Sequence, residues 1–184
     1  MTANWDTVLL TGSGIAAVLF LMAAPMLRQR RGILLGQLAA GVSFVIHYWA
    51  LGIPVAALVN SLGCVQTLAA LKTGQGAASR SLGYALALVM VGVAILFWDG
   101  PVSAFSVAGM TLIALGRMQH DQIHLRGMIF AGGLFWLVHD ILSAAWLAVA
   151  ADAGALVTGA IGLSRLLVRF RIEWIGPVRA QSMA

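Results

Sequence analysis

Charged side chains are scarce in this sequence. Only 9% of its 184 residues are charged and 61% are hydrophobic, with a mean hydropathy of +0.95. Soluble domains carry about a quarter charged residues, so water is excluded as the main solvent of this chain. Each bilayer-spanning helix needs roughly 20 largely apolar residues, and about seven would use nearly the whole chain. The composition predicts an all-α integral membrane protein without a soluble domain.

Several reactive residue types are also nearly absent. Cys64 is the single cysteine, which excludes an intrachain disulfide and a multi-cysteine metal site. Lys72 is the single lysine and lies at the end of an apolar run, which excludes a retinal Schiff base inside the bundle. No nucleophile elbow, Walker loop, dinucleotide-binding glycine fingerprint or zinc-protease motif occurs. We therefore expect no enzyme, no catalytic residue, no cofactor and no metal.

Apolar runs between glycine, proline and charged breaks predict seven transmembrane helices. The sixth and seventh runs are hard to divide, because no basic residue lies between Gly127 and Arg165. That stretch exceeds one span but suits two, so a tight turn is expected near residues 143–146. The predicted spans are residues 8–27, 33–51, 54–71, 82–97, 101–115, 127–143 and 145–170.

The basic residues predict the orientation. Lys and Arg near helix ends resist translocation and stay in the cytoplasm. With the amino terminus outside and the carboxyl terminus in the cytoplasm, all eleven Lys and Arg fall on one side. This explains the sequence pI near 10.7 without nucleic acid, whose binding needs a clustered basic patch. The eleven residues are Arg28, Arg30, Arg31, Lys72, Arg80, Arg117, Arg126, Arg165, Arg169, Arg171 and Arg179.

A shift of 92 residues superposes residues 44–47 on residues 136–139, and brings Gly41 onto Gly133 and Asn60 onto Asp152. Chance similarity between apolar helices is the alternative. A duplication predicts two parallel three-helix repeats, residues 8–72 and 101–170, followed by a short cytoplasmic tail, residues 171–184. A linker helix, residues 82–97, joins them in a 3+1+3 arrangement, and its lack of polar side chains from Ala85 onward suits lipid on every side. Parallel repeats are common in transporters, whose substrate site lies near the midplane.

Polar residues inside the apolar runs are the candidate functional residues. An ionisable side chain at mid-bilayer costs roughly 2.5–3.5 kcal/mol on insertion scales, so it usually faces the bundle interior. Asp140 and Asp152 form the candidate proton relay. The predicted substrate-binding residues are His47, Asn60, Trp136, His139 and Asp152.

Each candidate also has a structural explanation. The two histidines and Asn60 are equally explained by interhelical hydrogen bonds, and Asp140 by a pair with the adjacent His139. Asp152 would cap the seventh helix in water if that helix began later. A metal site formed by His47 and His139 is not expected, because no third or fourth ligand has defined spacing. His120, Asp121 and His124 have metal-like spacing but are expected to form a solvated helix end.

The stretch from His47 to Gly52, then Asn60, then residues 136–140 resembles the YgjV family of bacterial inner-membrane proteins. Here Asp140 stands where the family has Asn after its second His, and the downstream Gly is replaced near Ala144. The resemblance implies a multi-pass protein of the bacterial inner, or plasma, membrane and transfers no activity. The 3+1+3 arrangement is distantly similar to the SWEET and PQ-loop carriers and to the PnuC-type carriers.

Two main hypotheses of function follow. The first is a transporter of a small polar solute, either a facilitator or proton-coupled, with rocking of the two halves. The second is a non-transporting accessory or assembly protein that packs against a larger membrane complex. A membrane-embedded enzyme is a third, weaker class. Membrane lipid and a small polar solute are the expected partners, a second copy or a membrane complex would be further ones, and nucleic acid is not expected.

Overall fold

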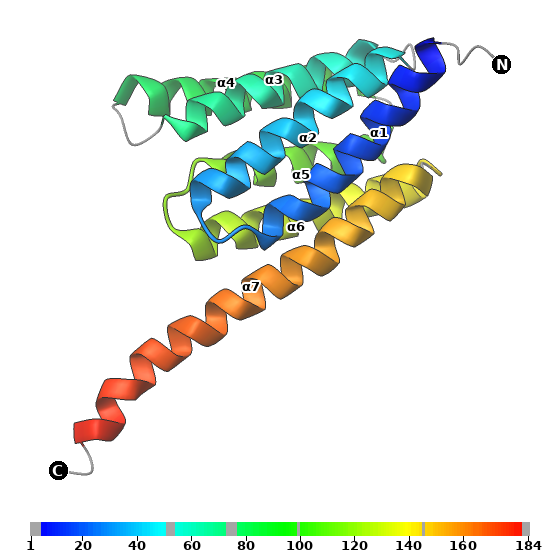
Figure 1. Ribbon diagram of the computed structural model, residues 1–184. Coiled ribbons are helices and arrows are strands. Elements are labelled where there is room, and N and C mark those ends of the chain that lie inside the picture. Colours follow the sequence, from blue (N-terminus) through cyan, green and yellow to red (C-terminus); the bar gives the residue numbers. More distant parts are fainter. Residues whose placement is uncertain (1–4, 51–53, 73–76, 99, 145, 182–184) are drawn as a thin grey trace.

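The computed structural model describes residues 5–50, 54–72, 77–98, 100–144 and 146–181, and its regular structure is entirely helical (Figure 1). The prediction of an all-α protein with seven helices is therefore confirmed. The helices are α1 (Trp5–Ala23), the short 3-10 helix η1 (Ala24–Met26), α2 (Arg30–Ala50), α3 (Pro54–Leu71), α4 (Ala77–Leu96), α5 (Ser103–Arg117), α6 (Gln122–Leu142) and α7 (Trp146–Gln181).

Within the residues that the structure describes, four stretches are long and apolar enough to cross a bilayer: Val8–Met26, Arg30–Ala50, Gln122–Leu142 and Ala148–Arg169. The remaining helices contain shorter apolar stretches, Ala57–Leu71, Arg80–Val93 and Ser103–Arg117. Large apolar side chains point outward along the bundle, with Leu88 and Leu96 exposed by 72% and 82%. Water would make this surface costly, whereas lipid makes it favourable.

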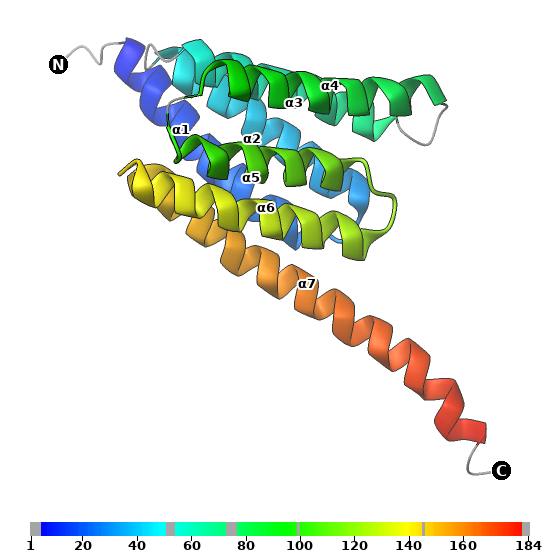
Figure 2. The same ribbon diagram turned by 180° about the vertical axis from the view of Figure 1, so that it is seen from behind.

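Neighbouring helices in sequence pack side by side: α1 on α2, α2 on α3, α5 on α6 and α6 on α7. Two further pairings close the bundle, α1 with α7 and α3 with α5. Helix α4 packs against α3 and α5 (Figure 2). Its Ala87 and Met90 are buried, so the expectation that lipid suits every side of this helix is wrong. An apolar helix surface fits a protein neighbour as well as lipid, and the flexible Met side chain fills an irregular gap.

The turn between α6 and α7 lies where the apolar pattern placed it. Helix α6 ends at Leu142 and α7 begins at Trp146. Ala144 adopts a φ of 54°, a left-handed conformation that reverses the chain in few residues. Helix α7 also continues to Gln181, so most of the predicted tail is helical. The predicted end of the last helix came from hydropathy, which marks only the membrane-spanning part. The helix itself continues for as long as its backbone hydrogen bonds form.

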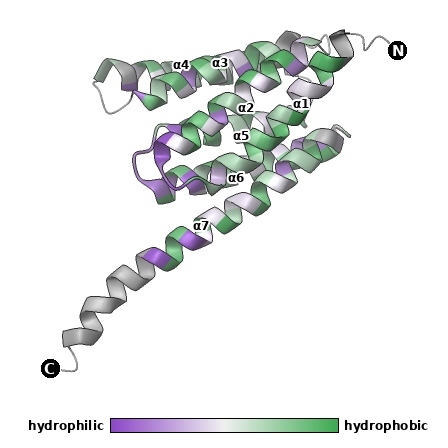
Figure 3. Cartoon of the chain, in the orientation of Figure 1, coloured by the Kyte–Doolittle hydropathy of each residue, from purple (hydrophilic) through white to green (hydrophobic). Residues whose placement is uncertain are grey.

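Hydrophilic residues gather where α1 joins α2 and where α5 joins α6 (Figure 3). We call this end of the bundle the basic end, because Arg28, Arg30, Arg31, Arg117 and Arg126 lie there. A buried apolar cluster of Ile33, Leu34, Ala70, Met118 and Leu125 packs at the same end.

His120, Asp121 and His124 lie at the amino end of α6, which begins at Gln122. Asp121 is the N-cap residue, and its carboxylate accepts the backbone N–H of His124 over 2.9 Å and the ring Nδ1 of His124 over 2.7 Å. The backbone N–H of His124 holds the pKa of Asp121 below its ordinary value. His120, Asp121 and His124 are all exposed, which agrees with a solvated helix end.

Candidate solute site

A cavity of about 220 Å³ lies inside the bundle. Helices α1, α2 and α3 line it together with α5, α6 and α7, and Met90 of α4 also reaches it. An apolar protein cavity of about 150 Å³ holds benzene, so this cavity has room for a small metabolite.

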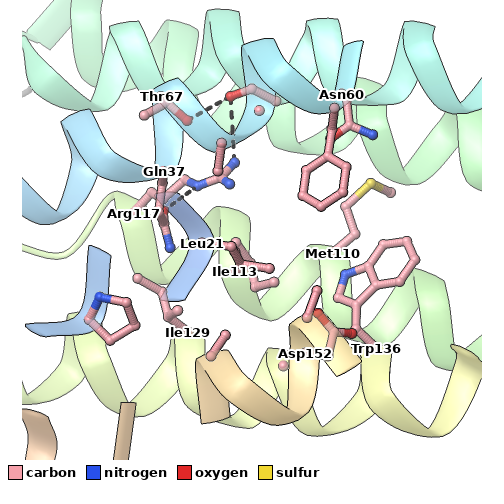
Figure 4. Close-up of a pocket in the computed structure, with 18 of the residues that line it drawn as sticks. Leu21, Gln37, Asn60, Thr67, Met110, Ile113, Arg117, Ile129, Trp136 and Asp152 are labelled. Carbon is pink, nitrogen blue, oxygen red and sulfur yellow. Dashed lines mark hydrogen bonds between the residues drawn. The ribbon is translucent and has the colours of Figure 1, made fainter. Parts of the chain in front are cut away.

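Four of the predicted residues line this cavity: Asn60, Trp136, Asp140 and Asp152. Asn60, Trp136 and Asp152 surround one region of it (Figure 4). Asp152 is six residues beyond the start of α7 and half-buried, so it is not the cap of that helix. Asp140 is buried, with 7% of its surface exposed. The structure brings these four side chains together, and their roles in binding and proton transfer stay predictions.

The two predicted histidines do not line the cavity. The Nδ1 N–H of His47 donates to the carbonyl of Leu10 over 3.0 Å, and the ring packs where Gly14 has no side chain. This is the interhelical hydrogen bond that was the alternative explanation for His47. His139 donates through Nδ1 to Asp140 over 2.9 Å. Its ring meets the Trp136 ring edge-on, with the two ring centroids 5.3 Å apart. His139 therefore positions two cavity side chains from outside.

A polar network that the sequence did not reveal surrounds Arg117. Its Nε donates to Gln37 Oε1 over 2.8 Å, and its Nη1 lies 3.5 Å from the Gly63 carbonyl (Figure 4). The same Nη1 lies 3.4 Å from Gln66 Oε1. Gln66 is fully buried and donates to the Ala114 carbonyl over 2.9 Å. The sequence pattern indicates only a topological role for Arg117. The available signal was the presence of Gln37 and Gln66 inside apolar runs, where an amide needs a partner.

Arg30, at the start of α2, crosses to the end of α5. Its Nε donates to the Gln119 carbonyl over 2.7 Å, and its Nη2 donates to the Arg117 carbonyl over 2.8 Å and to the Ala70 carbonyl over 3.0 Å. Helix carboxyl ends carry unpaired carbonyls and partial negative charge. Arg30 thus satisfies carbonyls at the ends of both α3 and α5.

Arg126, near the start of α6, makes the reciprocal contact with the end of α1. It donates from Nη1 to the Pro25 carbonyl and from Nη2 to the Leu27 carbonyl, both over 2.6 Å. Pro25 and Leu27 lie 92 positions before Arg117 and Gln119, which supply the carbonyls that Arg30 binds. We call these two sets of hydrogen bonds the arginine clamps. Each clamp ties the first helix group, α1–α3, to the second, α5–α7, at the basic end.

The lining of the cavity follows the same spacing of 92 residues. Most residues that line it from the first helix group have a partner at that distance in the second group that also lines it. The pairs are Leu21 and Ile113, Pro25 and Arg117, Gln37 and Ile129, Gly41 and Gly133, Phe44 and Trp136, Tyr48 and Asp140, Val59 and Ala151, Asn60 and Asp152, Gly63 and Ala155, Cys64 and Leu156, and Thr67 and Gly159.

The model of the family Imp-YgjV, described as a bacterial inner membrane protein, matches residues 10–169. No curated protein matches the chain, and no solved structure matches it. The matched range includes every residue that lines the cavity.

Proposed function

The chain belongs to the Imp-YgjV family of bacterial inner membrane proteins, and from this premise we propose that it carries a small polar solute across that membrane. The family match confirms the resemblance drawn from the two histidine motifs. The observation that carries the proposal is a cavity that both helix groups bound and that they line at matched positions. Carriers commonly place the substrate between two repeats near the middle of the bilayer.

The proposal treats α1–α3 and α5–α7 as parallel repeats joined by α4. In this arrangement α1 corresponds to α5 and α3 corresponds to α7. The contact of α1 with α7 then has its counterpart in the contact of α5 with α3, and both occur. The paired lining residues and the matched carbonyl positions of the two arginine clamps support the same correspondence.

We assign the basic end to the cytoplasm, with the amino terminus outside, from the distribution of Lys and Arg. The arginine clamps and the buried cluster around Leu125 would then lie at the cytoplasmic side of the cavity and oppose its opening. Rocking of the two helix groups would open that side by breaking the clamps. Because the clamps end on neutral carbonyls rather than carboxylates, they can exchange their partners for water at moderate cost.

Asp140 and Asp152 are the candidates for proton coupling. Both carboxyl groups line the cavity. A hydrogen bond between two carboxyl groups requires a proton, because an ionised carboxylate only accepts. A proton bound between them and released as the halves move would couple transport to the proton gradient. The proposed activity contains no chemical step on the solute.

Uptake into proteoliposomes tests the proposal. The purified chain is reconstituted, and uptake of radiolabelled sugars, amino acids and vitamins is compared with that of empty vesicles. We expect uptake of at least one class and its loss in Asp152→Asn, while Asp121→Asn, a change of the same chemistry at an exposed cap, keeps it. No uptake of any class, together with co-purification in a stable larger complex, would instead identify an accessory subunit.

A further inference from the structure

Two positive charges face the cavity without a negative partner. Arg117 and Arg126 both line it, and among the described residues neither forms an ion pair with a carboxylate. Their hydrogen bonds end on neutral oxygens of backbone carbonyls and glutamine amides. A charge removed from bulk water is normally paired, because neutral dipoles only partly replace its lost solvation. The electrostatics of this end of the cavity therefore favour an anion.

The hydrogen-bond donors of Arg117 are only partly used. The bond from Nε to Gln37 is short, at 2.8 Å, but the two contacts of Nη1 at 3.4 and 3.5 Å exceed the usual N–H to oxygen distance. Nη2 makes no hydrogen bond within the described part of the chain. Arg126 likewise has a buried Nε without a partner there. A guanidinium presents five donors in a planar fork that suits the paired oxygens of a carboxylate or phosphate.

The Arg117 side chain is also held in place before any ligand arrives. Gln66 is fully buried, and its amide N–H bond to Ala114 directs its oxygen toward Arg117. Gln37 is 8% exposed and fixes Nε from a different helix. Such preorganisation lowers the entropy lost on binding.

The other region of the cavity has different chemistry. Asn60, Trp136 and Asp152 lie on the opposite side of the view from Arg117 and Gln37 (Figure 4). Carboxyl and amide oxygens there accept hydrogen bonds from hydroxyl or amino groups, and an ionised carboxylate repels a second anionic group. The cavity is therefore polarised from a cationic end to an acidic end.

We propose that the cavity binds a small organic anion whose carboxylate or phosphate group lies on Arg117. The hydroxyl or amino groups of the same molecule reach Asn60 and Asp152. This inference rests on the proposed function, since it names the chemical class of the solute that is carried.

Binding measurements with matched solutes test this inference. The purified full chain in an uncharged detergent is titrated by calorimetry with two anions, gluconate and glucose 6-phosphate, and with glucose as the neutral partner of both. We expect at least one anion to bind about tenfold or more tightly than its neutral partner, as one buried charge-assisted contact provides. Arg117→Gln should remove that preference. Arg31→Gln removes the same charge at an exposed site outside the cavity and should keep it.

Three results would overturn the inference: no anion of the panel binds, neutral partners bind as tightly as the anions, or Arg117→Gln binds the anions as the parent does. If Arg117→Gln does not fold, Arg117→Lys keeps the charge without the paired donors, and we expect weaker binding with a retained anion preference. A Lys variant that loses the preference while folded would also count against it.

A lipid phosphate could supply the same chemistry, so the titration is repeated in nanodiscs with and without phosphatidylglycerol. Stabilisation by that lipid alone, with no effect of soluble anions, would overturn the assignment to a solute. The two proposals fail separately. Anion binding without uptake would refute the carrier only, and uptake of neutral solutes without anion preference would refute the anion site only.

Discussion

Helices α1–α3 and α5–α7 line one cavity, but the two groups supply different chemistry. Among the described residues, the charged side chains that line the cavity are Arg117, Arg126, Asp140 and Asp152, and all four belong to the second group. The first group contributes neutral polar side chains, Gln37, Tyr48, Asn60 and Thr67.

The difference is clearest at positions 92 residues apart. At a spacing of 92 residues, Asn60 corresponds to Asp152, and Tyr48 corresponds to Asp140. The framework is thus shared by the two groups, while the charge is confined to one of them. In a rocking motion the charges would move together with α5–α7, and their neutral partners would move with α1–α3. The solvation of the charges would therefore change as the cavity opens.

The largest expected effect comes from exchanging the charge between matched positions. Asp152→Asn should lower proton-driven uptake about tenfold or more, the size of a typical coupling between two binding sites, because an amide cannot bind and release the coupling proton. If the two groups are equivalent, the double variant with Asn60→Asp and Asp152→Asn should recover part of the uptake. Proteoliposome uptake with and without a pH gradient measures both. Asn60→Asp alone should not take up solute faster than the parent does. A double variant whose uptake is as low as that of Asp152→Asn would refute the equivalence.

The arginine clamps give the next largest effect. Arg30→Gln and Arg126→Gln should each lower the free energy of unfolding by about 1.5–3 kcal/mol, the contribution of hydrogen bonds from a charged group. Arg126→Gln should be the more damaging, because Arg126 is 9% exposed and its loss leaves the carbonyls of Pro25 and Leu27 unpaired. Denaturant unfolding in detergent checks this order. Arg31→Gln, an exposed control, should change stability by less than about 0.5 kcal/mol, and an equal loss there would show that only total charge matters.

A single methyl group at Gly162 tests the same contact sterically. A Cβ there would clash with the Pro25 carbonyl oxygen and lie 2.9 Å from Arg126 Nη1, so α7 must move away from η1. Gly162→Ala should therefore cost about 1–3 kcal/mol through overpacking. At Gly127, on α6, a Cβ meets nothing within 4 Å, and Gly127→Ala should instead stabilise by about 0.4–1 kcal/mol. Thermal unfolding of the two variants should shift in opposite directions.

The smallest effect is expected at the exposed start of α6. Asp121→Ala should cost about 0.5–1 kcal/mol, since it removes an N-cap acceptor in water. The pKa of Asp121 is lowered in the folded chain, so its contribution is present above its unfolded pKa of about 3.9 and is lost as the pH falls through the lower folded pKa. Stability curves of parent and variant should therefore converge below about pH 3.9. A constant difference down to pH 2 would show that the carboxylate is not the cap.

Part of the candidate site was predictable because bilayers penalise polar groups. Asn60, Asp140 and Asp152 stood out inside apolar runs, and all three line the cavity. His47 stood out for the same reason, yet it bonds the Leu10 carbonyl. The penalty requires a polar side chain to find a partner, but whether that partner is a neighbouring helix or a ligand depends on the rotation of the helix.

The all-helical class, the seven helices and the turn between Leu142 and Trp146 follow from the sequence alone, because apolar runs mark the helices and lipid requires their backbone polar groups to pair within each helix. Only the tertiary structure decided what the basic residues do. Arg31 is exposed, whereas its neighbour Arg30 bonds the end of α5 and Arg117 faces the cavity. One position along a helix turns a side chain by about 100°, and packing between helices far apart in sequence determines which of these directions meets solvent and which meets a partner.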